Sequence, residues 1–219
     1  MKGEAMKVLV TAGSTQVPID QVRSIGNIFK GRTGLAIAQY FADKGAEVTL
    51  LTSGKHSSEL IYIHEYRTFD ELAQRMEFFV RYGKFDAIIH SAAVSDYRVS
   101  RILDENLQDI DAGKKISSAH PKIFLEMTPT IKLIDQIRAP WGFRGKLVKF
   151  KLQVGITDEE LLAIARESLA VSGADLIVAN CLEWARQRAY VLGANKCVCA
   201  RVAREDLPEF LYRRLTNAQ

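Results

Sequence analysis

Short runs of apolar residues alternate with amphipathic stretches along most of this chain. The apolar runs are typical of strands that are buried on both faces of a parallel sheet. They lie at Lys7–Ala12, Glu47–Leu51, Leu60–His64, Asp86–His90, Lys146–Lys151 and Asp175–Ala179. Between them, apolar residues recur at helical spacing in Gly34–Lys44, Phe69–Tyr82 and Asp158–Val171. The pattern therefore predicts a doubly wound α/β fold, with a Rossmann-like, mainly parallel sheet between two layers of helices.

The middle of the chain, from Val94 to Arg144, breaks this alternation. Within it, Lys114–Ser118 and Lys122–Met127 are predicted to be short strands, and Thr128-Pro129 is predicted to begin a helix. A segment of this length that leaves the sheet is typical of a flap or binding loop. We therefore expect a single domain over residues 1–219, with an inserted flap at about residues 94–127.

The C-terminal part predicts a closing hairpin followed by a helix. Ala189–Leu192 and Cys197–Val202 are the expected strands, and Gly193-Ala194-Asn195 is the expected turn. Asp206–Leu215 is the expected helix, with Pro208 in its first turn, where a missing backbone N–H costs little.

The composition excludes several functional classes. Of 219 residues, 47% are apolar and 26% are charged, which is ordinary for a globular protein. The net charge of +4 is compatible with an anionic substrate. The sequence lacks the clustered basic stripe that is typical of nucleic-acid-binding proteins. No apolar run is long enough to span a membrane, and no apolar signal segment stands at the N-terminus. We expect a cytoplasmic protein whose three cysteines are reduced and structural, without a metal site.

Polar segments follow several predicted strands at the edge where a doubly wound sheet binds its ligands. The first strand runs into a loop with Gly13, Arg23 and Asn27, and Gly31 and Gly34 open the next helix. Free backbone N–H groups and the positive end of a helix favour a phosphate at such a place. Arginine can bind a carboxylate or phosphate with two parallel hydrogen bonds, and asparagine can donate to a carbonyl. We therefore expect a nucleotide or phosphate site here.

Three further candidates each have a plain structural alternative. Asp96, which follows Ser91-Ala92-Ala93 at a strand end, either lines the site or forms a surface pair with Arg98. Lys115 in the polar middle segment is either a ligand-binding group or a solvated lysine. Phe150 at a strand end is either a nucleotide-stacking residue or part of the core. None of these residues is decisive alone.

A nicotinamide-dependent oxidoreductase is disfavoured. The spacing from Gly13 to Gly31 and Gly34 is much too long for a G-x-G-x-x-G fingerprint. The second strand ends in Leu51-Thr52-Ser53, without the acidic residue that binds a ribose diol.

Taken together and in order, the motifs resemble phosphopantothenate–cysteine ligase (phosphopantothenoylcysteine synthetase) over nearly the whole chain. The shared segments are Thr11-Ala12-Gly13-Ser14-Thr15, Pro18 to Asn27, Gly31 with Gly34, Ala92 to Tyr97, Lys115 to Ser118, Thr128-Pro129, Phe150-Lys151-Leu152 and Val178-Ala179-Asn180. Because the chain begins directly at the ligase part, the resemblance implies the stand-alone form.

The resemblance implies a ligase that joins 4'-phosphopantothenate to cysteine in coenzyme A biosynthesis. A nucleoside triphosphate, ATP or CTP, would activate the carboxylate as an acyl-nucleotidylate, with Mg²⁺ neutralising the triphosphate. Asn27, Arg23 and Lys115 match the catalytic positions of the family. Gly13, Ser91, Ala92, Ala93, Asp96 and Phe150 match positions that line the nucleotide. The flap of this family reaches toward a second subunit, so a homodimer is expected.

One segment departs from the family. Where the family has two serines after the asparagine, this chain has Asn27-Ile28-Phe29-Lys30-Gly31. Lys30 would place a positive charge beside the phosphate that a serine hydroxyl binds in the family. We therefore count Lys30 among the expected nucleotide-binding residues. The same departure keeps open a second hypothesis, a non-catalytic paralogue that binds a nucleotide or phosphopantothenate without turnover.

Overall fold

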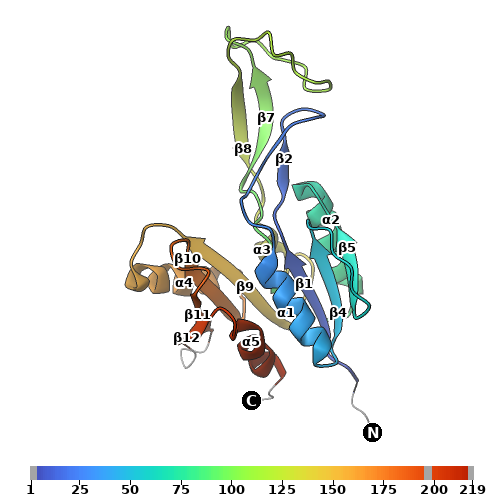
Figure 1. Ribbon diagram of the computed structural model, residues 1–219, viewed down its shortest axis with the longest axis vertical. Helices are drawn as coiled ribbons and strands as arrows, with labels where there is room; N and C mark the ends of the chain where they lie inside the picture. Colours follow the sequence, from blue (N-terminus) through green and yellow to red (C-terminus); the bar gives the residue numbers. More distant parts are fainter. Residues whose placement is uncertain (1–3, 195–198, 217–219) are drawn as a thin grey trace.

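The computed structural model describes residues 4–194 and 199–216 and confirms the predicted α/β architecture. Within these residues, eight strands form one sheet in the order β12-β11-β10-β9-β6-β1-β4-β5 (Figure 1). The strands from β10 to β5 in this order are parallel, whereas β11 pairs antiparallel with β10 and β12. Their bounds are β1 Lys7–Ala12, β4 Glu47–Thr52, β5 Ile61–Glu65, β6 Ala87–His90, β9 Lys146–Gln153, β10 Leu176–Cys181, β11 Arg188–Gly193 and β12 Cys199–Ala203.

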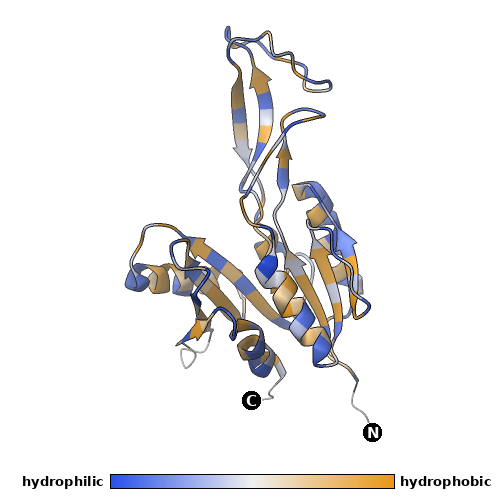
Figure 2. Cartoon of the chain, in the orientation of Figure 1, coloured by the Kyte–Doolittle hydropathy of each residue, from blue (hydrophilic) through white to orange (hydrophobic). Residues whose placement is uncertain are grey.

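Helices cover both faces of the sheet, each over its own apolar cluster. Alternate residues of a strand point to opposite faces, so Val8 and Val10 of β1 face α1 and α5, while Leu9 faces the side of α2, α3 and α4. Figure 2 shows how strongly apolar residues concentrate in the strands of this sheet. The helices are α1 Arg32–Asp43, α2 Phe69–Tyr82, α3 Leu133–Gln136, α4 Asp158–Ser172 and α5 Leu207–Thr216. None of the helices in the described ranges is long and apolar enough to cross a membrane.

The strand order reverses at β1. The chain passes from β1 to β4 and β5 on one side and returns through α2 to β6 on the other side of β1. The loops that follow β1 and β6 leave the sheet at this switch point, which is where open α/β sheets bind their ligands. The parallel bridge between Ser14 and Ala93 holds the two loops side by side.

Two hairpins project beyond this edge of the sheet and form what we call the arm (Figure 1). The first consists of β2 (Gln16–Pro18) and β3 (Ser24–Gly26), which the sequence pattern did not predict. The second pairs β7 (Tyr97–Leu103) with β8 (Phe124–Pro129) across a long connection.

The expectations for the middle segment are partly wrong. The predicted strand at Lys122–Met127 corresponds to β8, but Lys114–Ser118 forms no strand. Thr128-Pro129 ends β8 instead of beginning a helix, and α3 starts at Leu133. At the C-terminal end, the predicted hairpin is confirmed as β11 and β12, while Asn195 and Cys197 lie outside the described residues.

The packing of α1 on β1 generates a first prediction. A Cβ atom at Gly34 would lie 2.5 Å from Ser91 Oγ, 2.7 Å from Ala12 Cβ and 3.0 Å from Thr11 O. Gly34→Ala is therefore expected to lower the free energy of unfolding by about 1–3 kcal/mol, measured by urea denaturation. Gly26→Ala is the control, because its Cβ would meet nothing closer than 3.9 Å. Equal stability of the two variants would contradict the tight contact.

Candidate active site

The loop after β1 turns sharply and packs against the start of α1. Gly13 has φ +90°, and a Cβ there would lie 2.1 Å from Ser53 Oγ, so only glycine fits. Gly31, with φ +75°, approaches so closely that its Cβ would lie 2.2 Å from the Gly13 nitrogen. No side chain caps the first N–H groups of α1, and its first turn carries no acidic residue. The positive end of this helix therefore has no capping side chain, an arrangement that favours an anionic ligand.

The loop after β6 lies directly against the loop after β1. Ala93 N–H donates to Gly13 O (2.8 Å), and Thr15 N–H donates to Ala93 O (3.2 Å). Ser91 Oγ donates to Thr11 O at 2.6 Å, which binds the start of this loop to β1. The structure thus brings Gly13 together with the predicted Ser91-Ala92-Ala93 segment at the switch point.

Asn27 joins this group from the base of the β2–β3 hairpin. Its Nδ2 donates to Ala93 O at 3.2 Å, and its own carbonyl accepts a longer bond from Ser14 Oγ at 3.4 Å. One amide hydrogen is therefore used to orient the side chain, and the other is available to a ligand. Lys30, which is exposed, lies between Asn27 and the start of α1.

A buried pair under these loops was missed by the sequence analysis. His90 ends β6, and its Nδ1 lies 2.9 Å from Thr11 Oγ1, which accepts a bond from Ala92 N–H. Burial, with Lys149 nearby, lowers the pKa of His90 to about 4. The ring is therefore neutral at pH 7 and can accept the hydroxyl hydrogen of Thr11. The only signal in the sequence was a histidine at the end of an apolar strand, which has no distinctive spacing.

Asp96 follows β6, and Phe150 lies in β9, the strand that pairs with β6. Asp96 is exposed, pairs with Lys132, and accepts a backbone bond at its carbonyl from Thr130 N–H. Phe150 follows the residue of β9 that pairs with His90, so it lies level with Ser91. Its ring is half-buried against the apolar cluster of α1 and α5, as the core alternative anticipates.

The structure places Arg23 and Lys115 at the far end of the hairpin. Arg23 donates from Nε (3.0 Å) and Nη2 (2.6 Å) to the Asp20 carboxylate and from Nη2 to Ile116 O (2.7 Å). Lys115, which is exposed, is the neighbour of Ile116. β3 separates Arg23 from Asn27 by roughly 13 Å at about 3.3 Å per residue. Within one chain, the predicted catalytic residues therefore form two groups.

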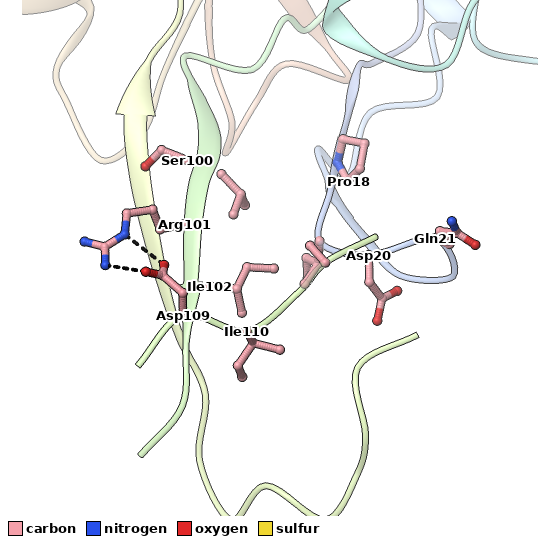
Figure 3. Close-up of a pocket in the computed structure, with 11 residues that line it drawn as sticks. Pro18, Asp20, Gln21, Ser100, Arg101, Ile102, Asp109 and Ile110 are labelled. Carbon is pink, nitrogen blue, oxygen red and sulfur yellow. Dashed lines mark hydrogen bonds and ion pairs between the residues drawn. The ribbon is translucent and has the colours of Figure 1, made fainter. Parts of the chain in front are cut away.

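A cavity of about 540 Å³ opens between the two hairpins of the arm (Figure 3). Ile102 and Ile110 point into it from one side, and Pro18, Asp20 and Gln21 border it on the other. The remaining lining residues are Ile19, Val99, Ser100, Arg101, Asp109 and Ala112. This cavity belongs to the arm and is distinct from the loops at the switch point.

The buried histidine makes the stability of the fold depend on pH. The pKa of His90 is about 4 in the folded protein and about 6.5 when exposed, so the unfolded chain binds an extra proton between these values. Lowering the pH from 7 to 5 is expected to reduce the free energy of unfolding by about 2 kcal/mol through this group. Urea denaturation at both pH values should show that His90→Asn loses most of this dependence, whereas His120→Asn retains it. An unchanged pH dependence in His90→Asn would contradict the assignment.

The chain resembles known proteins over most of its length. Residues 3–209 match the family described as DNA/pantothenate metabolism flavoprotein C-terminal domain. The coenzyme A biosynthesis bifunctional protein CoaBC of Thermococcus kodakarensis is 38% identical over 183 residues, which is 82% of this chain and 42% of that protein. The chain thus spans less than half the length of this relative.

Solved structures agree with the sequence match. The DNA/pantothenate metabolism flavoprotein from Streptococcus pneumoniae has a TM-score of 0.83 and 31% identity, covering 96% of this chain and 98% of that chain. A mutant of Cab2, solved in complex with phosphopantothenate-cysteine, has the same fold, with a TM-score of 0.74 at 17% identity over 95% of this chain and 86% of that chain. From the matched residues and the shared fold, the chain belongs to the DNA/pantothenate metabolism flavoprotein C-terminal domain family.

Proposed function

We propose that this protein joins 4'-phosphopantothenate to cysteine in coenzyme A biosynthesis, using a nucleoside triphosphate. The observation that carries the proposal is the contact of the Gly13 loop, the Ala93 loop and Asn27 beside the uncapped start of α1. The relative named CoaBC belongs to coenzyme A biosynthesis, and Cab2 binds phosphopantothenate-cysteine, the product expected here.

The reaction needs activation because hydroxide is a poor leaving group from a carboxylic acid. In the proposed route, a carboxylate oxygen attacks the α-phosphorus and pyrophosphate leaves, which gives an acyl-nucleotidylate. The neutral amino group of cysteine then attacks the acyl carbon and loses a proton to solvent, and the nucleoside monophosphate leaves with the electron pair of the broken C–O bond. Both steps depend on positioning and on stabilising negative charge, which backbone N–H groups and fixed amides do well.

Asn27 is proposed to orient the acyl-nucleotidylate during the second step. Its bond to Ala93 O fixes the amide plane, so the remaining N–H points in a set direction. Donation to the acyl or phosphoryl oxygen would stabilise the charge that develops as the amine attacks. Arg23 and Lys115 are proposed to act on the anionic groups of the ligands.

The nucleotide is proposed to lie across the ends of β1, β6 and β9. Its phosphates would face the Gly13 loop, the start of α1 and Lys30, while Ser91-Ala92-Ala93, Asp96 and Phe150 would line the nucleoside. Mg²⁺ accompanies triphosphates and keeps mostly phosphate and water ligands. In the described ranges, no group of three His, Cys, Asp or Glu gathers to hold a metal. The Mg²⁺ ion is proposed to arrive with ATP or CTP.

A homodimer is proposed because Lys115 and Asn27 lie at opposite ends of the β2–β3 hairpin within one chain. A second copy that packs along the arm would bring one flap toward the other site. The arm also exposes large apolar side chains that a partner would cover: Val22, Ile25, Tyr97, Leu107, Phe124 and Met127. The cavity between the hairpins adds a concave surface to the same region.

The dimer can be tested by sedimentation velocity at micromolar concentration. Wild-type protein is expected to sediment as a dimer, and Val22→Glu is expected to shift it toward the monomer, because a buried charge would face an apolar surface. Val171→Glu is the control, since Val171 is as exposed as Val22 but lies on α4. A monomeric wild-type protein would refute the proposal.

A non-catalytic binding protein is the second candidate, favoured by Phe29 and Lys30 in place of the two serines. Phe29 offers no conventional hydrogen bond to a phosphate, and its side chain is partly exposed beside Asn27. Such a protein would bind a nucleotide yet release no pyrophosphate when both co-substrates are present.

One assay separates the candidates. Purified protein with phosphopantothenate, cysteine, Mg²⁺ and either ATP or CTP is expected to yield pyrophosphate and the amide product, followed by mass spectrometry. Asn27→Asp should keep the fold, since the side chain is exposed, and should slow amide formation about 100-fold or more. Asn106→Asp, an exposed amide on the arm, is the matched control and should stay near wild-type activity. Nucleotide binding without pyrophosphate would support the binding protein instead.

A further inference from the structure

We infer that Asp20 is a positioning residue that latches the flap segment 113–116 onto the tip of the β2–β3 hairpin and so holds Lys115 in its working position. The latch comprises Asp20, Gln21 and Arg23 on the hairpin, and Gly113 and Ile116 on the flap. The role given to Lys115 rests on the proposed function, whereas the contacts that form the latch do not depend on that function.

The Asp20 carboxylate is enclosed and fully used. Its side chain has no exposed surface, although the hairpin tip around it is exposed. Oδ1 accepts from the N–H groups of Val22 (2.8 Å) and Arg23 (2.7 Å), which shapes the turn. Oδ2 accepts from Arg23 Nε (3.0 Å), Arg23 Nη2 (2.6 Å) and Ile116 N–H (3.0 Å). The last bond joins two segments that are 96 residues apart in sequence.

Both backbone groups of Ile116 are bound by the hairpin. Its N–H donates to Asp20 Oδ2, and its carbonyl accepts from Arg23 Nη2 at 2.7 Å. Gln21 Nε2 adds a bond to Gly113 O at 2.6 Å. The Ile116 side chain is only 3% exposed, while Lys115 and the three residues that follow Ile116 are exposed. These contacts fix the backbone on both sides of Lys115 and leave its side chain free to reach a ligand.

The electrostatics indicate a structural task for this carboxylate rather than proton transfer. The Arg23 guanidinium, helped by the hydrogen bonds from Ile116, Val22 and Arg23 N–H groups, holds the pKa of Asp20 well below its usual range. Asp20 therefore stays charged at any pH at which an enzyme of this kind works, and no proton is available from it. With Nε and Nη2 engaged, Arg23 can contact a ligand only through Nη1.

A second ion pair on the arm provides a matched comparison. Arg101 binds Asp109 through two bonds of 3.0 Å, but both side chains are about half or more exposed. Exposed pairs contribute little, whereas a buried carboxylate that loses its partners leaves those partners unsatisfied. Asp109→Asn should therefore leave the flap undisturbed, and Asp20→Asn should release it.

Limited trypsin digestion measures the latch directly, because Lys114 and Lys115 stand inside the latched segment. In the wild-type protein, cleavage after these lysines is expected to be slow. Asp20→Asn should speed cleavage there about tenfold or more, and Asp109→Asn should change it less than twofold. Cleavage of folded Asp20→Asn at the wild-type rate would overturn the latch.

If Asp20→Asn gives no cooperative thermal unfolding, Arg23→Lys decides the question. That variant keeps the charge beside Asp20 but loses the fork that also reaches Ile116 O, so it should likewise speed cleavage after Lys114 and Lys115. Wild-type resistance in Arg23→Lys would then overturn the proposal.

Activity tests the link to Lys115. If Asp20 acts by placing Lys115, the Asp20→Asn, Lys115→Ala double variant should be no more than about twofold slower in amide formation than Lys115→Ala alone. Losses that multiply would show that Asp20 acts independently of Lys115 and would overturn the positioning role. If the wild-type protein forms no amide, the proposed function fails, while the digestion still decides whether the latch exists.

Discussion

Helix α1 begins closer to the end of β1 than a side chain at Gly31 or Gly34 would permit. This close approach leaves the uncapped N–H groups of the helix facing the switch point. It also lets the loops after β1 and β6 exchange backbone hydrogen bonds, so that Ala93 can orient Asn27. The candidate active site is therefore built mainly from backbone geometry, and the candidate side chains lie around it.

The main sheet was predictable because its strands are buried on both faces and read as continuous apolar runs. β1 and β6 are examples, since nearly every residue in them is buried. The arm was not predictable in the same way. β7 is mostly exposed and β2 spans three residues, so neither carries a periodic pattern, and the pairing of β7 with β8 depends on a contact distant in sequence.

The sequence singled out the candidate residues of the site, but it did not show that they form two separate groups in space. Arg23 and Asn27 are four positions apart and looked like neighbours in one loop, yet β3 places them at opposite ends of a hairpin. The roles of Asp20 and His90 depend on burial and on partners about 80 or more residues away, and no local spacing reveals such partners. In the proposed function the two groups have different tasks: the nucleotide is proposed to bind at the sheet edge, and the hairpin tip holds the flap.

The central claim is that the carboxylate of phosphopantothenate is activated by transfer of a nucleotidyl group. Phosphopantothenate labelled with ¹⁸O in its carboxylate, turned over with cysteine and ATP or CTP, tests it most directly. The account predicts that one labelled oxygen appears in the nucleoside monophosphate, because the C–O bond breaks when the amine displaces it. Label found in inorganic phosphate or in water, and not in the nucleoside monophosphate, would contradict it.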